Sequence, residues 1–262
     1  MSHEGSARGV GFGVDVGGSG IKGAAVDLAT GEFAGERTRL PTPSPATPEA
    51  VAELVAQLVG DAEATDTAGE PGSPVGVTVP GIVDDGVVRS AANIDAAWIG
   101  TDADALFSAR LGRPVHVVND ADAAGLAEVR WGAARDRRGL VLVTTLGTGI
   151  GTALVHDGVL VPNAELGHLE VGGRNAEQWT ANSAREREEL SWEEWAERLQ
   201  VYYRHLERLF TPTLFVVGGG VSKHADRFLP LLDLSTPIVP ASLRNRAGIV
   251  GAAHQAAAHA AG

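Results

Sequence analysis

Residues 12–27 read FGVDVGGSGIKGAAVD, and residues 140–155 read LVLVTTLGTGIGTALV. In each stretch an apolar run, a glycine-rich turn and a second apolar run follow one another, as in two antiparallel strands joined by a tight turn. The same unit therefore occurs once in each half of the chain. This repetition predicts two α/β domains of similar plan with a cleft between them.

The remaining elements fit the same α/β class. Apolar residues at helical spacing predict helices over 48–59, 102–111, 121–131, 192–209, 221–229 and 246–260. Short apolar runs predict further strands over 32–40, 75–79, 115–118, 214–217 and 237–240. Gly60 is expected to end the first helix and to lead into a polar surface loop over 61–74.

The domain boundaries follow from this order of elements. Residues 1–9 are predicted to form a disordered tail. A smaller α/β domain is expected over 10–119 together with the C-terminal helix, about residues 246–262, and a larger one over 120–245.

Composition narrows the classes of function. The 262 residues are 44% hydrophobic, carry a formal net charge of −12 and include no cysteine, which excludes disulfides, thiol nucleophiles and cysteine-ligated zinc. A nucleic-acid binder would show a basic excess or stripe, and neither is present. Residues 1–12 hold no apolar signal-peptide core, and no later stretch approaches 18 apolar residues, so we expect a soluble, cytoplasmic protein without membrane contact.

The first glycine cluster, Asp15-Val-Gly-Gly-Ser-Gly20, lies between two predicted strands. It is neither a Walker A loop nor a dinucleotide fingerprint, because a strand and not a helix follows it. Its backbone N–H groups could bind anionic oxygens, and a plain hairpin turn is the alternative explanation of the glycines. Asp15 is harder to explain, since a carboxylate in an apolar strand is costly unless it is paired or faces a metal.

Two further glycine clusters lie in the second half. Thr145-Leu-Gly-Thr-Gly-Ile-Gly151 is the matching turn, and Val217-Gly-Gly-Gly-Val-Ser-Lys223 follows a strand and opens a predicted helix, whose start would attract an anion. The only two lysines, Lys22 and Lys223, each lie beside a glycine cluster. A compact ammonium beside a phosphate would explain this, and so would a genome that favours arginine codons.

Two polar motifs complete the set. Asn119-Asp120 follows an apolar strand, where ligands bind in α/β sheets, but an aspartate there could also cap the next helix. Glu165-Leu-Gly-His168 would by itself be ordinary surface sequence.

Taken together and in order, the motifs Asp15–Gly20, Asn119–Ala124, Glu165–His168 and Val217–Gly220 resemble those of the ROK family of sugar kinases. Within it the chain is most similar to actinobacterial polyphosphate glucokinases, which share Gly17–Gly23, Thr145–Gly151, Leu190–Trp195 and the 243–251 tail. The resemblance implies a two-domain actin-like/hexokinase-like ATPase fold. It also implies phosphorylation of the 6-hydroxyl of glucose by inorganic polyphosphate, and in some members by ATP.

Site roles are implied residue by residue through the same resemblance. Asp120 would be the general base, and the sugar-binding residues would be Asn119, Asp120, Glu165, His168 and Glu177. Asp15 would organise Mg²⁺ through water. The residues at the phosphates or nucleotide would be Asp15, Gly17, Gly18, Ser19, Gly20, Lys22, Thr145, Gly147, Thr148, Gly149, Gly219, Gly220 and Lys223. The family's zinc site needs cysteines, which 169–180 lacks, so no zinc is expected.

Several alternatives stay open from sequence. A strictly ATP-dependent ROK glucokinase or a glucomannokinase would carry the same site, and the candidates for a basic polyphosphate groove are Lys22, Lys223, Arg244 and Arg246. A ROK transcriptional regulator would need an N-terminal winged helix, and about ten residues precede the first strand. A homodimer is implied by resemblance. The apolar stripe from Trp192 to Leu209 is expected to lie either in the hydrophobic core or in the interface of this homodimer.

Overall fold

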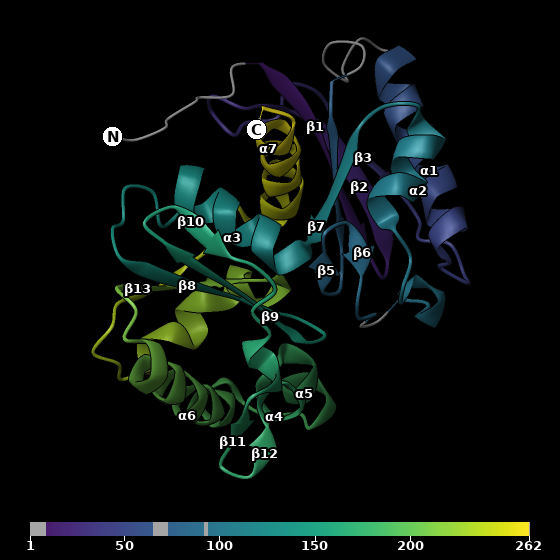
Figure 1. The fold of residues 1–262 in the computed structure, drawn as a ribbon. Helices are drawn as coiled ribbons and strands as arrows, with labels where there is room; N and C mark the ends of the chain where they lie inside the picture. Colours follow the sequence, from purple (N-terminus) through teal and green to yellow (C-terminus); the bar gives the residue numbers. More distant parts are fainter. Residues whose placement is uncertain (1–8, 65–72, 92–93, 262) are drawn as a thin grey trace. The chain divides into compact units, whose positions relative to one another are not determined.

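The computed structural model describes residues 9–64, 73–91 and 94–261 (Figure 1). The chain divides into two compact units, Met1–Ala127 with Arg246–Gly262, and Glu128–Asn245. The chain therefore passes from the first unit to the second within helix α3 (Asp120–Trp131). Of the predicted tail 1–9, only Gly9 lies within the described residues.

The first unit is built on a five-stranded mixed sheet. Its strands are β1 (Val10–Gly17), β2 (Gly20–Asp27), β3 (Thr38–Leu40), β4 (Val75–Val79) and β7 (Val115–Asn119), in the order β3-β2-β1-β4-β7. The first three run antiparallel to one another, whereas β4 and β7 run parallel to β1. The predicted strand over 32–40 thus forms only at its last three residues.

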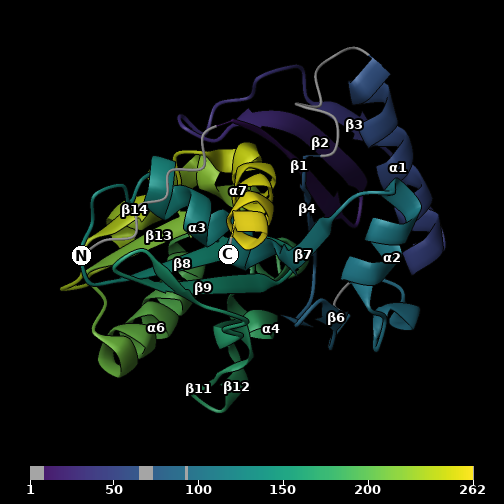
Figure 2. The ribbon, with the colours of Figure 1, turned by 45° about the horizontal axis from the view of Figure 1, so that its top comes forward.

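Helices cover both faces of this sheet (Figures 1 and 2). Helices α1 (Pro48–Ala64) and α2 (Ala103–Leu111) lie on one face, and α7 (Ala247–Ala261) lies on the other. Alternate β1 side chains divide accordingly, since Phe12 and Val14 enter the core under α1 and α2 while Gly13 faces α7. A side chain at Gly13 or at Gly76 would collide with the α7 backbone, so these glycines permit the helix to approach the sheet.

The second unit repeats the plan of the first. Its sheet comprises β8 (Leu140–Leu146), β9 (Ile150–His156), β10 (Val159–Val161), β13 (Leu214–Gly218) and β14 (Ile238–Pro240), in the order β10-β9-β8-β13-β14. An antiparallel meander is again followed by two strands parallel to its first member. The predicted α/β class with a repeated strand–turn–strand unit is confirmed.

Helix α6 (Trp192–Phe210) packs on one face of this second sheet. It begins with the predicted capping box, in which Ser191 and Glu194 satisfy each other's backbone N–H groups. The central residues of the predicted apolar stripe are buried, namely Trp195, Leu199, Tyr202 and Leu206. Leu209 is 55% exposed, so the stripe belongs to the core except at its end.

Three local predictions were wrong. Helix α1 continues through Gly60 to Ala64, because a glycine facing open space weakens a helix without breaking it. The predicted helix over 221–229 is a pair of 3₁₀ segments, η3 (Gly220–Arg227) and η4 (Leu229–Leu231), with a kink at His224. Two short helices, α4 (Ala176–Thr180) and α5 (Asn182–Arg187), occupy a stretch where no helix was predicted.

The shorter elements are connections within each unit. They are β5 (Val83–Asp84), β6 (Val87–Val88), β11 (Glu170–Val171), β12 (Arg174–Asn175), η1 (Ala96–Trp98), η2 (Leu166–His168) and η5 (Arg244–Arg246). No helix within the described parts of the chain has the length and hydropathy needed to cross a bilayer.

Candidate active site

In the first unit, polar residues gather where β1, β4 and β7 end. Asp15 on β1 pairs in register with Thr78 on β4, which in turn pairs with Val118 on β7. Strands in a sheet are about 4.8 Å apart, so Asp15 and the end of β7 are separated by about 10 Å of sheet. This edge therefore brings Asp15, the turn after β1 and Asn119-Asp120 into one region of the unit.

Asp15 is held by three neighbours. Its Oδ2 lies 3.1 Å from the Lys22 ammonium on the adjacent strand, and Thr78 donates a hydrogen bond of 3.1 Å to Oδ1. Gly248, in the first turn of α7, lies beside the carboxylate, where the positive end of the helix dipole favours a negative charge. These contacts explain how an apolar strand accommodates an aspartate.

The turn that follows β1 exposes its backbone. Gly18 and Ser19 are exposed, and a hollow lined in part by Gly17, Gly18 and Thr42 borders the turn. Thr42 donates a 2.5 Å hydrogen bond to the Gly17 carbonyl, and the Arg39 guanidinium donates one of 2.8 Å to the Ser19 carbonyl. The carbonyl groups of Gly17 and Ser19 in this turn therefore both accept hydrogen bonds from side chains of the same unit.

Asn119, and not Asp120, caps helix α3. The Asn119 side-chain oxygen accepts hydrogen bonds from the N–H groups of Ala121 (2.8 Å) and Asp122 (3.0 Å), and its amide nitrogen donates to the Gly81 carbonyl at 3.0 Å. Asp120 is the first residue of the helix, half-buried, and its Oδ1 accepts from Ala121 N–H at 2.8 Å. The helix-cap interpretation of Asp120 is therefore unnecessary.

In the second unit two glycine turns lie side by side. Thr145, near the end of β8, pairs in register with Gly218 at the end of β13. Gly219 has a φ of +81°, and a side chain there would collide with the backbone of Leu146. Only glycine fits this close approach. The turns 147–149 and 218–220 consequently form one backbone-lined surface.

The Glu165–His168 motif packs against the start of β9. The Leu166 N–H donates to the Thr152 hydroxyl at 3.0 Å, and a side chain at Gly167 would collide with the Ile150 carbonyl. The His168 Nε2 lies 3.7 Å from the Glu165 Oε2. Burial raises the pKa of the Glu165 carboxyl; the His168 charge opposes this shift and the Glu177 charge adds to it.

Glu177 connects the predicted sugar residues to the 147–149 turn. Its Oε2 accepts a hydrogen bond of 2.8 Å from the Ile150 N–H, directly after the turn. A side chain at Gly149 would collide with the Glu177 carboxylate, so glycine leaves room for that carboxylate. Its charge also raises the pKa of Glu165, so Glu177 acts on both motifs.

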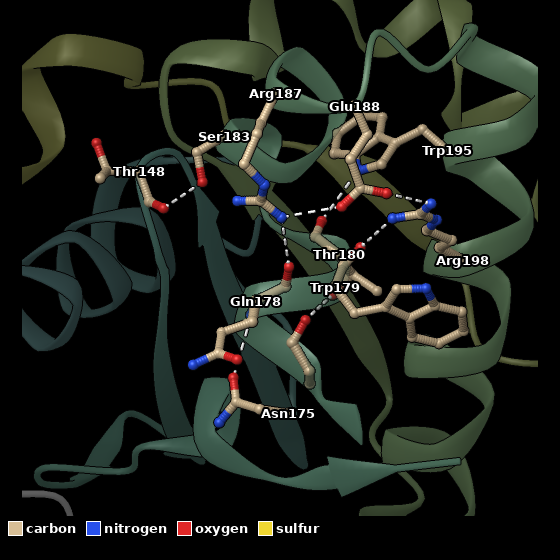
Figure 3. Close-up of polar contacts among 11 residues, drawn as sticks. Thr148, Asn175, Gln178, Trp179, Thr180, Ser183, Arg187, Glu188, Trp195 and Arg198 are labelled. Carbon is tan, nitrogen blue, oxygen red and sulfur yellow. Dashed lines mark hydrogen bonds and ion pairs between the residues drawn. The ribbon is translucent and has the colours of Figure 1, made fainter. Parts of the chain in front are cut away.

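Helices α4 and α5 brace this region (Figure 3). Ser183 in α5 donates a 2.6 Å hydrogen bond from its hydroxyl to the Thr148 carbonyl. At the other end of α5, the Arg187 guanidinium donates to the Gln178 carbonyl at 2.9 Å and to the carboxylate of Glu188. The Glu188 carboxylate also forms an ion pair of 2.6 Å with Arg198 on α6. The two guanidiniums lower the pKa of Glu188. Ser183 was missed from sequence because no local motif surrounds it.

The four basic residues suggested for a polyphosphate groove differ in their surroundings. Lys22 is paired with Asp15, and Arg246 is paired with Glu32. Lys223 is exposed and, across the described residues, forms no ion pair; the same holds for Arg244.

The oxygen ligands near the first turn fit a magnesium ion. Mg²⁺ keeps several waters and typically takes one or two protein carboxylates plus substrate phosphates, and Asp15 is one carboxylate beside an exposed backbone turn. Among residues 9–64, 73–91 and 94–261 no group of three or more His, Cys, Asp or Glu side chains could enclose a metal ion.

The model of the ROK family matches residues 11–180. Over 244 residues the chain is 52% identical to the polyphosphate glucokinase of Mycobacterium tuberculosis (strain CDC 1551 / Oshkosh), covering 93% of this chain and 89% of that protein. The structure matches the inorganic polyphosphate/ATP-glucomannokinase of Arthrobacter sp. strain KM with a TM-score of 0.92 and 60% identity, over 96% of this chain and 100% of that one. It also matches a ROK family glucokinase from Streptomyces griseus in complex with glucose and AMPPNP, with a TM-score of 0.79 and 26% identity over 95% and 99% of the two chains.

Proposed function

The chain belongs to the ROK family, and from this premise we propose that it transfers a phosphoryl group from inorganic polyphosphate, and also from ATP, to the 6-hydroxyl of glucose. The observation that carries the proposal is the identity to polyphosphate-using glucokinases, which extends over nearly the whole chain and both units. The alternatives are a strictly ATP-dependent ROK glucokinase and a glucomannokinase.

Asp120 is proposed to accept the proton of the sugar hydroxyl. Phosphoryl transfer depends mainly on positioning and on charge stabilisation, and a positioned base contributes on the order of a hundredfold or more to the rate. Because Asn119 satisfies the helix start, the Asp120 carboxylate is not required as a cap. The α3 dipole also favours its negative charge.

The sugar hydroxyls are proposed to bind Asn119, Asp120, Glu165, His168 and Glu177. Asn119 donates one amide hydrogen to Gly81, and an amide nitrogen carries two, so one remains for a sugar oxygen. Glu165 directly precedes η2 and His168 ends it, and the two side chains offer an acceptor and a donor. Glu177 is tied to Ile150, which fixes the carboxylate beside Glu165.

The donor phosphates are proposed to bind the glycine turns. In the first unit these residues are Gly17, Gly18, Ser19, Gly20 and Lys22, and in the second Thr145, Gly147, Thr148, Gly149, Gly219, Gly220 and Lys223. Magnesium, when bound, would neutralise charge on the donor. Asp15 would hold it through water, and the Lys22 ammonium, 3.1 Å from Asp15, would orient that carboxylate.

The acid-to-amide variant Asp120→Asn tests the catalytic role. We expect glucose binding to persist and turnover to fall by about a hundredfold or more, since the amide cannot accept the proton. A matched control is Asp102→Asn, at the N-cap of α2, where asparagine caps as well as aspartate and turnover should not change. Near-normal turnover of Asp120→Asn would remove the residue from the mechanism.

Donor and sugar preference are tested in one coupled assay for hexose 6-phosphate. Wild-type protein is supplied with glucose or mannose and with polyphosphate or ATP. Product from ATP alone would favour the ATP-dependent alternative, and equal turnover of mannose would favour a glucomannokinase.

Assembly and location are part of the same proposal. A homodimer in the cytoplasm is proposed by resemblance, with the exposed residues Val201 and Leu209 of α6 as part of its interface. Light scattering of wild-type protein and of Leu209→Glu would test this, since a charge in the interface should produce monomers.

A further inference from the structure

The carbonyl groups of the 147–149 turn are held from one side by helix α5. The Ser183 hydroxyl donates to the Thr148 carbonyl at 2.6 Å (Figure 3). The Ser183 N–H donates to the Gly147 carbonyl at 3.1 Å. Two consecutive peptide groups of the turn are thereby fixed by one residue that lies 35 positions further along the chain.

This contact also orients the N–H groups of the turn. A trans peptide is planar, and its C=O and the following N–H point in opposite directions. With the carbonyls of Gly147 and Thr148 directed at α5, the N–H groups of Thr148 and Gly149 point away from it. Neither N–H donates a hydrogen bond to any described part of the chain, and Thr148 is exposed.

The other two glycine turns show the same arrangement. The Thr42 hydroxyl donates to the Gly17 carbonyl at 2.5 Å, and the Ser222 hydroxyl donates to the Gly219 carbonyl at 2.8 Å. The N–H groups that follow belong to Gly18 and Gly220. Both are exposed residues, and neither N–H donates a hydrogen bond within the described ranges.

We propose that Thr42, Ser183 and Ser222 are positioning residues that turn the backbone N–H groups of the three glycine turns toward the phosphates of the donor. The inference rests on the proposed function, in which those turns bind the donor. Successive backbone N–H groups that face one side form an anion-binding surface, and a hydroxyl behind each turn keeps the carbonyls out of it. The hydroxyls themselves do not touch the phosphates.

Ser183 gives the sharpest test, because its control lies nearby. Ser183→Ala removes the bond to Thr148 and allows that peptide to rotate, whereas Ser183→Thr keeps a hydroxyl. Ser191→Ala is the matched control: it also removes a serine hydroxyl bound to backbone, at the start of α6, but it touches no glycine turn. It should lower thermal stability through loss of the helix cap.

Binding of inorganic tripolyphosphate is measured by calorimetry with Mg²⁺ and 6-deoxyglucose, which lacks the hydroxyl to be phosphorylated. We expect Ser183→Ala to weaken tripolyphosphate binding about fivefold, while Ser183→Thr and Ser191→Ala stay within about twofold of wild type. Glucose affinity should be the same in all four proteins. Ser222→Ala, in an exposed turn, provides a second variant should Ser183→Ala fail to fold.

Unchanged tripolyphosphate binding in Ser183→Ala and Ser222→Ala would overturn the inference. So would an equal weakening of tripolyphosphate binding in the control Ser191→Ala. A wild-type protein that does not bind tripolyphosphate would overturn it as well. The proposed function fails differently. A wild-type protein that binds tripolyphosphate but forms no glucose 6-phosphate from any donor would refute it, and the binding comparison would still decide the role of Ser183.

Discussion

The turn between β1 and β2 and the turn between β8 and β9 occupy equivalent places in two sheets of the same strand order. Two residues before the first turn stands Asp15, with Lys22 and Thr78 as its partners on the adjacent strands. Two residues before the second stands Thr145, whose partners on the adjacent strands are both glycines.

The difference shows how a repeated scaffold divides its chemistry. The first turn has an ion pair beside it, 3.1 Å between the charged atoms and about one-quarter exposed on either side. The strands on either side of the second turn carry no acidic or basic side chain near the turn, and the carboxylate beside that turn, Glu177, comes from helix α4. The charged residues of the first unit therefore lie on the strands of the sheet, whereas that of the second unit lies on a helix that contacts the sheet.

The largest expected effect separates the two turns directly. Asp15→Asn should lower kcat/KM by about a hundredfold or more with either donor, since the carboxylate proposed to hold Mg²⁺ is lost and the Lys22 ammonium loses its ion-pair partner. Thr145→Val, the equivalent change in the second unit, should cost only about fivefold. Steady-state kinetics with polyphosphate and ATP provide the measurement, and equal losses in the two variants would contradict the division of roles.

A smaller effect is expected at the glycines of the second turn. Gly149→Ala places a methyl group where the Glu177 carboxylate lies, which displaces that carboxylate from Ile150 and should reduce kcat/KM by about tenfold. Gly60→Ala, in α1 and outside the proposed site, also meets no atom within 4 Å and provides the control, with activity within about twofold of wild type. A loss in Gly149→Ala no larger than that in Gly60→Ala would contradict the role of Gly149 in leaving room for Glu177.

The smallest effect concerns the pH dependence of sugar binding. Because burial raises the pKa of Glu165, that carboxyl takes up its proton at a higher pH than an ordinary glutamate as the solution is acidified, and KM for glucose should then rise. His168→Gln removes a charge that lowers this pKa, so the acid limb should move to higher pH. Glu177→Gln removes a charge that raises it, so the limb should move to lower pH.

The pH midpoint of KM for glucose, and not its absolute value, is the quantity to compare, since both side chains are also proposed sugar ligands. Shifts of His168→Gln and Glu177→Gln in the same direction would contradict the assigned causes.

Sequence patterns were reliable where structure is local. The two hairpins with their glycine turns and the capping box at Ser191 follow from periodicity and from contacts within a few residues. The predictions failed where contacts with distant residues, and not the local sequence pattern, decide the structure. Gly60 carries no helix-ending contact, and helices α4 and α5 are held by bonds to α6 and to the 147–149 turn.

By itself the sequence determined the repeated α/β plan and the family, and it predicted the residues of the site, because each depends on short motifs and their order along the chain. Only the tertiary structure decided that Thr78 donates a hydrogen bond to Asp15, that Gly149 makes room for Glu177 and that Ser183 donates to the Thr148 carbonyl, 35 residues before it. These contacts join residues that lie far apart in the sequence, so no local pattern encodes them.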